Sequence, residues 1–447
     1  MRVVIIGGVA AGMSAGAKLK RESPETTVVV YERDDQVSYG SCGLPYFVAG
    51  YNDDWRLLIA RTAEAHIAAG IEVRLFHEVT AIDPTNKAIT GRRRDTGETF
   101  SDTYDRLLIA VGACPVLPSF PGINQPGVHS LRTIADGIAL LEDLKRPETR
   151  EVIIIGGGYI GIELAEAALA QGKKVRCMEA GPQVLMQFEP EIAETAAAAL
   201  LRHGADIHIN EMVTAIHSGS HRLCCVETEV GRYEADLVIM AIGVRPNTAF
   251  LADSGVKMAE NGAIIVDREQ RTNLPDIYAT GDCAEVYHAL IGENRYLPLA
   301  TTANKCGRLV AANLLGGNEQ FVGTLGSAAL KVMDRELART GLSEAECLEL
   351  GYDVQCQVVE VPNHPVYYPD QSSLRFKLVA DRKTHRLLGA QGSGADGVVL
   401  RIDIFAAAIT NGMTTEAIGQ LDLCYSPPFS SAWDAVLVAS NAIKFTE

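Results

Sequence analysis

Two short apolar runs that end in glycines organise the first half of the chain. Residues 2–6 read RVVII and lead into GGVAAG, and residues 151–155 read EVIII and lead into GGGYIG. Runs this short, bounded by glycine turns, are typical of buried strands and fall well below the length of a membrane span. Each run is followed by a helical stretch and then by a second strand with an acidic end, TTVVVYE or KKVRCME. The pattern predicts one strand, turn, helix, strand unit that occurs twice.

The duplication continues past these units. HEVTAID around Val79 matches EMVTAIH around Val213, and each is followed by a strand that ends in Ala-x-Gly, LLIAVGACP or LVIMAIGVRP. A repeat of this kind predicts an α/β fold that contains two doubly wound, Rossmann-like nucleotide-binding domains.

The second copy carries a complete G-x-G-x-x-G at Gly156, Gly158 and Gly161. In such a turn the first glycine permits the tight bend, the second lets a pyrophosphate approach the backbone, and the third lets the helix pack on the strand. Glu179 comes at the offset where a carboxylate accepts a hydrogen bond from a ribose 2′-hydroxyl, which favours NADH over NADPH. Arg176 precedes this acid and would partly offset its charge. A glycine-rich turn without a ligand is the alternative.

The first copy departs from this pattern at one position. Gly7 and Gly12 hold the outer places, Val9 stands at the middle one, and Glu32 supplies the acid. A third segment, ATGDCA, places Asp282 directly after a strand and a glycine, where it can accept hydrogen bonds from a sugar-like chain.

These motifs together resemble the FAD- and NAD(P)H-dependent pyridine nucleotide–disulfide oxidoreductases over essentially the whole chain. The resemblance implies that FAD is bound by Gly7, Gly12, Glu32, Val79, Asp282 and Ala300. It implies that NADH, with NADPH possible, is bound by Gly156, Gly158, Tyr159, Ile160, Gly161, Glu179 and Gly243. In that family the tyrosine at the position of Tyr159 covers the flavin until the nicotinamide displaces it.

The resemblance also implies a division into domains. Residues 1–112 and 246–322 are expected to form the FAD-binding domain, and residues 113–245 the NAD(P)H-binding domain. Residues 323–447 are expected to form a C-terminal α+β dimerisation domain.

One cysteine stands apart from the others in the loop VSYGSCGLPYF. Cys42 precedes a helix predicted to begin near Gly43, and a helix N-terminus lowers a thiol pKa. The sequence therefore predicts a reactive thiolate that serves as the redox nucleophile. A buried, inert thiol is the alternative, and it is what we expect for Cys114, Cys177 and Cys283, which lie within or beside apolar strands.

Cys42 has no second cysteine to pair with in this loop. Glutathione-reductase-like members of the family carry C-x-x-x-x-C, and here the second position is Phe47. Cys42 must therefore cycle through a mixed disulfide with an external thiol, a persulfide or a sulfenic acid. Ala10 stands where the NADH peroxidases and water-forming NADH oxidases carry a histidine. The form CGLPYF, with NHPVYYPD and LDLCYSPPFSSAWD near the C-terminus, resembles instead the coenzyme A-disulfide reductases and CoA-persulfide reductases.

In that branch the cysteine holds CoA as a mixed disulfide, and tyrosines from the partner subunit assist the leaving thiolate. The matching residues are Tyr425 and Tyr367, with Tyr368 as the alternative to Tyr367, whereas His364 is expected to be a loop residue. Ordinary interface packing is the other explanation for these tyrosines. The resemblance thus implies a homodimer with shared active sites.

Coenzyme A is polyanionic, and the chain is acidic, with a formal net charge of -16. A charge of this sign argues against a nucleic-acid or membrane partner and requires cations placed for the CoA phosphates. Cations at a helix C-terminus also suit the helix dipole, which is the alternative explanation for the basic end of the first helix. The expected substrate-binding residues are Lys18, Lys20, Arg21, Ser38 and Ser41.

The ten cysteines are scattered and include no C-x-x-C, so the sequence predicts neither a disulfide framework nor a metal site. A reducing compartment, most simply the cytoplasm, is expected. The sequence as a whole predicts an enzyme that passes electrons from NAD(P)H through FAD to a disulfide of Cys42 with coenzyme A, reducing CoA disulfide. The alternatives are a CoA-persulfide or polysulfide reductase, an NADH oxidase, or a reductase of a small electron-carrier protein in which Cys42 has no role.

Overall fold

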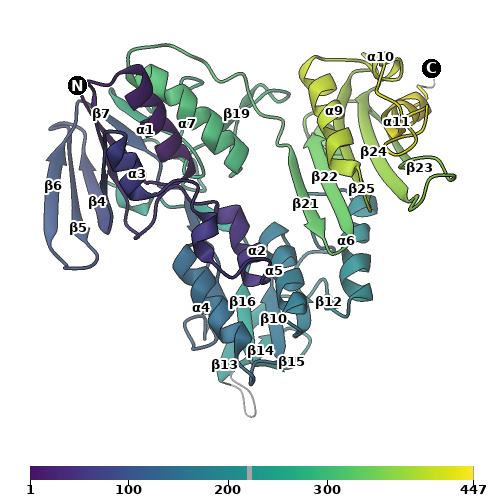
Figure 1. The fold of residues 1–447 in the computed structure, drawn as a ribbon, viewed down its shortest axis with the longest axis horizontal. Coiled ribbons are helices and arrows are strands. Elements are labelled where there is room, and N and C mark those ends of the chain that lie inside the picture. Colours follow the sequence, from purple (N-terminus) through teal and green to yellow (C-terminus); the bar gives the residue numbers. More distant parts are fainter. Residues whose placement is uncertain (219–223, 446–447) are drawn as a thin grey trace.

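The computed structural model describes residues 1–218 and 224–445 and consists of three lobes (Figure 1). The N-terminal lobe and the C-terminal lobe stand on either side, and the lobe built from the middle of the chain lies below and between them. Within the described residues, no helix is long and apolar enough to cross a bilayer.

The first lobe is built on a five-stranded sheet in the order β18-β7-β1-β2-β3, with parallel pairing throughout. Its strands are β1 (Arg2–Ile6), β2 (Thr27–Tyr31), β3 (Ile71–Arg74), β7 (Arg106–Ile109) and β18 (Ile277–Ala279). The edge strand β18 comes from far along the sequence, so the chain leaves this lobe and returns to complete its sheet. The helices α1 (Ala10–Glu22) and α7 (Ala300–Leu314) pack together in this lobe.

Smaller elements complete the first lobe. They are α3 (Ala63–Ala68), the 3-10 turns η2 (Trp55–Leu58) and η3 (Ala249–Leu251), the antiparallel sheet of β4 (His77–Asp83), β5 (Ala88–Arg93) and β6 (Thr99–Thr103), and the hairpin of β19 (Val286–His288) and β20 (Glu293–Arg295).

The middle lobe repeats this plan. Its sheet has the order β12-β11-β10-β16-β9. The strands are β9 (Val128–Ser130), β10 (Glu151–Ile155), β11 (Lys174–Met178), β12 (Asp206–His208) and β16 (Leu237–Met240). Around it lie α4 (Ile134–Lys145), α5 (Tyr159–Ala170), α6 (Pro190–Arg202) and an antiparallel sheet of β13 (Val213–Ser218), β14 (Cys224–Thr228) and β15 (Arg232–Ala235).

The two connections between the first and middle lobes run side by side. They are the short antiparallel strands β8 (Ala113–Pro115) and β17 (Val244–Pro246), paired with Ala113 opposite Pro246. The middle lobe is therefore inserted into the first through one narrow crossing.

The C-terminal lobe contains an antiparallel sheet in the order β21-β22-β25-β24-β23. The strands are β21 (Ala328–Val332), β22 (Arg335–Gly341), β23 (Val354–Pro362), β24 (Ser373–Asp381) and β25 (Leu387–Gly394), and the helices are α8 (Glu344–Glu349), α9 (Val398–Thr410), α10 (Thr415–Ile418) and α11 (Ala435–Ala442). With the two repeated lobes, this α+β lobe confirms the predicted fold class.

One short helix of the first lobe belongs to the core of the middle lobe. The 3-10 turn η1 (Ser41–Gly43) runs into α2 (Leu44–Val48), which packs against α4 and α5. Phe47 is 3% exposed and lies in the same apolar cluster as residues of the middle sheet. The loop of Cys42 therefore lies at the junction of the two lobes (Figure 1).

Candidate active site

The glycine turns of the two copies have matching geometry. Gly7 and Gly156 adopt φ of 103° and 106°, a region that glycine enters at little cost. A Cβ at either would lie 2.2 or 2.4 Å from a carbonyl oxygen of the neighbouring strand's end. At Gly12 and Gly161 a Cβ would lie 1.9 Å from the carbonyl oxygen of Gly7 or Gly156. All four positions thus admit only glycine without rearrangement.

The acids at the ends of β2 and β11 are also placed alike. The carboxylate of Glu32 accepts a hydrogen bond from the N–H of Gly8, and that of Glu179 accepts one from the N–H of Gly157, both at 2.7 Å. In each copy the acid is therefore held against the glycine turn, where a dinucleotide ribose would lie.

The middle position of the turn differs between the copies. A Cβ at Gly158 would meet no heavy atom within 4 Å, so this glycine borders open space at the start of α5. That opening, beside a helix N-terminus, fits the pyrophosphate of a nicotinamide dinucleotide. Val9 takes the same place before α1.

The guanidinium of Arg176 binds Asp206 and forms no ion pair with Glu179 in the described residues. Arg176 Nε donates to Asp206 at 2.8 Å, and the guanidinium lies over the ring of Tyr233 at 4.8 Å. The second oxygen of Glu179 accepts from the N–H of Gly181 at 2.7 Å. No cation is thus supplied by Arg176 for a 2′-phosphate.

The segment that carries Asp282 is tied to the middle lobe by a residue that the sequence did not single out. Arg132 Nη2 donates to Asp282 Oδ2 at 3.0 Å. The side chain of Asp282 keeps 19% of its surface exposed beside this bond. A carboxylate that is partly open and held from one side fits the hydroxyls of a polar ligand chain such as the ribityl group of FAD.

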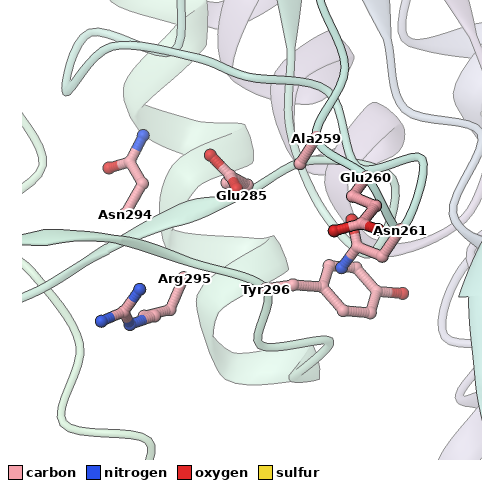
Figure 2. A pocket seen from close by; sticks show the side chains of 7 residues that line it. All are labelled: Ala259, Glu260, Asn261, Glu285, Asn294, Arg295 and Tyr296. Atoms are coloured by element: carbon pink, nitrogen blue, oxygen red, sulfur yellow. The ribbon is translucent and has the colours of Figure 1, made fainter.

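A surface hollow of about 450 Å³ adjoins this segment (Figure 2). It is lined by Ala259, Glu260, Asn261, Glu285, Asn294, Arg295 and Tyr296. The hydroxyl of Tyr296 donates to the carbonyl of Asp282 at 3.1 Å, so one wall of the hollow supports the expected flavin site from outside. Its two carboxylates and single guanidinium select no ligand class.

The remaining residues expected at the cofactors are spread over both lobes. Val79 is 7% exposed and lies where the register of β4 shifts. Ala300 is the first residue of α7, and Gly243 adopts φ of 119° between β16 and β17. Tyr159 and Ile160 open α5, and burial raises the pKa of Tyr159 to about 12.

Cys42 is solvent-exposed at the middle of η1. Partial burial of its sulfur raises the thiol pKa, and the carboxylates of Glu163 and Asp282 raise it further, against the weaker effects of Arg132 and Ser41. The prediction of a lowered pKa is therefore wrong for the groups of this chain. The physical reason is that α2 has only five residues and the nearest charges are mostly negative.

Glu163 is the main charge near Cys42, and the sequence analysis missed it. It lies on α5, and burial raises the pKa of its carboxyl to about 7. The hydroxyl of Tyr46, on α2, lies 3.5 Å from Glu163 Oε1. Two acidic residues, Glu163 and Glu166, on the otherwise apolar helix YIGIELAEAALA are the signal that could have revealed it.

The two expected serines occupy the loop of Cys42. Ser41 adjoins Cys42 in the chain, and its hydroxyl slightly lowers the pKa of the Cys42 thiol. Ser38 Oγ lies 2.8 Å from Nε2 of His66, a buried residue of α3 that the sequence analysis did not consider. Within the described residues, no group of acidic, histidine or cysteine side chains could hold a metal ion.

The three basic residues of α1 are placed differently from one another. Lys18 Nζ lies 3.6 Å from Glu22 and 3.8 Å from Glu319. Lys20 instead donates to backbone carbonyls after the helix, at 2.6 and 2.9 Å, so its ammonium stabilises the helix end and is not free for a phosphate. Arg21 is exposed and pairs with no acid among the described residues.

The C-terminal lobe brings two of the expected tyrosines together. Tyr367 and Tyr425 lie with their hydroxyl oxygens 3.4 Å apart, and the hydrogen bond between them raises the pKa of Tyr367. Tyr368 instead packs edge-on against His364. The geometry therefore pairs Tyr367, rather than Tyr368, with Tyr425.

The chain belongs to the pyridine nucleotide-disulphide oxidoreductase family. The model of that family matches residues 1–307, and the model of the family's dimerisation domain matches residues 327–436. The protein is thus a FAD-dependent NAD(P)H:disulfide oxidoreductase, as the motifs predicted.

Three relatives illustrate the range of the family. The NAD(P)H coenzyme A polysulfide/persulfide reductase of Pyrococcus horikoshii is 38% identical, over 99% of this chain and 98% of its own. The structure of reduced CoADR-RHD from Bacillus anthracis superposes with a TM-score of 0.95 at 32% identity, covering 99% of this chain and 79% of that one. The water-forming NADH oxidase from Lactobacillus brevis, bound to NADH, gives 0.94 at 32% identity, covering 99% and 98%.

Proposed function

We propose that the protein reduces the disulfide of coenzyme A, with Cys42 held between turnovers as a mixed disulfide with CoA. The observation that carries the proposal is the environment of Cys42. Its thiol is free and exposed, and the place of a resolving cysteine on α2 is taken by Phe47, whose side chain is buried in the core. The thiol therefore needs a partner from outside the chain.

The proposed cycle consumes one NADH, one CoA disulfide and one proton from water, and it yields NAD⁺ and two CoA thiols. When bound, FAD would pass on two electrons that NADH supplies. Two-electron reduction of the bond between Cys42 Sγ and the CoA sulfur would leave a Cys42 thiolate and a CoA thiolate. The CoA thiolate takes a proton, with help from the hydroxyl of Tyr425 or Tyr367. The Cys42 thiolate then attacks a new CoA disulfide, which restores the mixed disulfide and releases the second CoA thiolate.

The proposal includes a homodimer in which these tyrosines act on the partner's thiol. Apolar side chains near them are strongly exposed, with Val366 at 85% and Phe429 at 76%. Exposed apolar patches of this kind mark interaction surfaces. Cys42 variants and Tyr425 variants, each inactive alone, should recover activity in mixed dimers that contain one site with both wild-type residues.

Reduction of CoA persulfide or polysulfide is a second candidate, because the relative from Pyrococcus horikoshii carries that name at 38% identity. Both candidates use Cys42 and an external thiol. Steady-state turnover with CoA disulfide, CoA persulfide and oxygen as separate oxidants distinguishes them from each other and from an oxidase. The mass of the intact protein shows whether Cys42 carries CoA or an oxygen.

The test of the nucleophile is Cys42→Ser. Because the nucleotide sites are built from other residues, reduction of the bound flavin by NADH should stay at the wild-type rate. Turnover with CoA disulfide should fall by roughly a thousandfold or more, as when a covalent nucleophile is removed. Normal turnover in this variant would favour the carrier-protein reductase instead.

The test of the CoA phosphate site compares cations of α1. Lys18→Ala with Arg21→Ala should raise the KM for CoA disulfide roughly tenfold, since charge-assisted bonds to phosphate are stronger than neutral ones. Lys20→Ala is the matched control. Its ammonium binds backbone carbonyls, so it should lower the melting temperature and leave this KM unchanged.

A further inference from the structure

The buried side chain of His66 forms a hydrogen bond with Ser38, which belongs to the loop that carries Cys42. His66 lies on α3, is 3% exposed, and its Nε2 is 2.8 Å from Ser38 Oγ. Its other ring nitrogen, Nδ1, is buried without a hydrogen-bond partner among the described residues. Within the part of the chain that the structure describes, the imidazole of His66 forms one side-chain hydrogen bond, with Ser38. Its structural effect is therefore to orient the hydroxyl of Ser38.

The backbone of Ser38 is already fixed on both sides. Its N–H donates to the carbonyl of Gly8 at 2.9 Å, and its own carbonyl accepts from the N–H of Ala60 at 2.8 Å. Its φ of 51° lies in the left-handed region, which a serine adopts only when its surroundings hold it there. The hydroxyl torsion is thus the remaining freedom at this position, and His66 restricts it.

The protonation of His66 decides what the Ser38 hydroxyl can do. Burial lowers the pKa of His66, and the charge of Arg61 lowers it further, so the ring is neutral at physiological pH. A neutral ring has one N–H, and a buried N–H without an acceptor is rarer and more costly than an unused lone pair. The N–H is therefore on Nε2, where it donates to Ser38 Oγ. The hydroxyl hydrogen of Ser38 then remains free to donate outward.

We propose that His66 is a positioning residue that makes the Ser38 hydroxyl a hydrogen-bond donor to an amide carbonyl oxygen of the substrate held at Cys42. The inference rests on the proposed function, because the pantetheine arm of CoA supplies amide carbonyls between the sulfur and the phosphates. Ser38 and Cys42 belong to one loop, anchored to residues 58–60 by the bonds of Ser38 and Gly40. The proposed hydrogen bond recognises the pantetheine arm of the substrate and not its phosphates.

The test uses three disulfides that differ in whether they carry the pantetheine arm and the phosphates. CoA disulfide carries the arm and the phosphates, pantethine carries the arm alone, and hydroxyethyl disulfide carries neither. In His66→Phe the KM for the first two should rise about three- to tenfold, the range expected for one neutral hydrogen bond. The KM for hydroxyethyl disulfide, the kcat and the rate of flavin reduction by NADH should stay as in the wild type.

A double-mutant cycle separates positioning from general damage. If His66 acts through Ser38, Ser38→Ala alone and Ser38→Ala with His66→Phe should raise the KM for pantethine equally. His66→Gln keeps a side-chain N–H donor and should restore part of the wild-type value, and it replaces His66→Phe if that variant does not fold. His288→Phe is the control, because His288 is buried to the same degree and accepts only a backbone N–H.

Three outcomes would overturn the inference: additive effects of the two substitutions, an equal rise in KM for hydroxyethyl disulfide, or no change with pantethine. Failure of the proposed function has a different signature. In that case the wild-type enzyme itself would show no preference for CoA disulfide and pantethine over hydroxyethyl disulfide.

Discussion

The two nucleotide-binding copies are alike where they hold a cofactor and differ in the segment attached to the end of the second strand. In the first copy the chain continues from Glu32 into the loop of Cys42 and then into α2, which enters the core of the other lobe. In the second copy the chain continues from Glu179 to Glu189. There the N–H of Glu189 donates to Gln391 and its carboxylate binds the buried ammonium of Lys377.

The same structural unit binds a cofactor in both copies but carries a different segment after its acid in each. The outer glycines of the turn and the acid have the same geometry in both copies, whereas the segment that follows the acid differs in what it contributes. One segment supplies a thiol, and the other attaches the middle lobe to the C-terminal lobe. The chemistry of this protein therefore depends on a segment outside the repeated unit.

Among changes that compare the two copies, the largest effect is expected from exchanging the middle residue of the two turns. Gly158→Val places a side chain in the open space at the start of α5, where we infer the pyrophosphate of NADH lies. The KM for NADH should rise by roughly a hundredfold with little change in melting temperature, since backbone contacts to the pyrophosphate are blocked. Val9→Gly, the reciprocal change, should leave flavin content unchanged. A wild-type KM in Gly158→Val would show that the second copy tolerates a side chain at this position, as the first copy tolerates Val9.

A smaller effect is expected at the acid of the second copy. Glu179→Ala removes the acceptor for the ribose 2′-hydroxyl and the negative charge that repels a 2′-phosphate. The ratio of kcat/KM for NADH to that for NADPH should fall about tenfold. Arg176→Ala is the control and should leave the ratio unchanged, because this guanidinium binds Asp206. A ratio that already favours NADPH in the wild type would contradict the role of Glu179.

The repeated units could be predicted from the sequence because their determinants are local. Glycines at fixed offsets, an apolar strand and an acid at its end lie within about thirty residues and result from backbone geometry. The same holds for the exposed Cys42, which is set in a Gly- and Ser-rich loop. The pairing of Tyr367 with Tyr425 joins two distant segments, and the resemblance, not the spacing, led to it.

The electrostatics of the site could not be predicted in this way. Glu163 affects Cys42 because α2 packs against α5 of the middle lobe, and Arg132 of the middle lobe binds Asp282 of the first. Neither contact between lobes has a local signal in the sequence. The hydrogen bonds of Lys20 depend likewise on the carbonyls of Pro24 and Thr26, which lie after the end of the helix. Long-range contacts of this kind decide pKa values, and a linear pattern does not contain them.

A few-fold effect is expected from the charge beside Cys42. Glu163→Gln removes the nearest carboxylate, so the pKa of the thiol should fall and its alkylation by iodoacetamide at pH 7 should become about two- to fivefold faster. Glu166→Gln is the matched control one turn further along α5, where the carboxylate accepts from the N–H of Met333. Equal alkylation rates of Cys42 in the wild type and in Glu163→Gln would show that the Glu163 carboxylate does not raise the pKa of the thiol.

The smallest effect concerns stability against pH. The pKa of Glu163 is about 7 in the folded chain and lower in the unfolded chain, so the folded state binds more protons between these values. The free energy of unfolding should therefore decrease as pH rises through this window. Glu163→Gln should flatten the decrease, as measured by urea denaturation at pH 5 and pH 8. An identical slope in both proteins would contradict the raised pKa.

The crossing of β8 and β17 has a consequence for how such a molecule can arise. Ala113 and Pro246 are cross-strand neighbours, so the points where the middle lobe begins and ends lie within about 5.5 Å of each other. A segment inserted between two neighbouring points of a lobe does not separate the strands of that lobe's sheet. The middle lobe is therefore an insertion into the first lobe. A duplicated segment inserted at this crossing leaves the strand order of the first sheet unchanged.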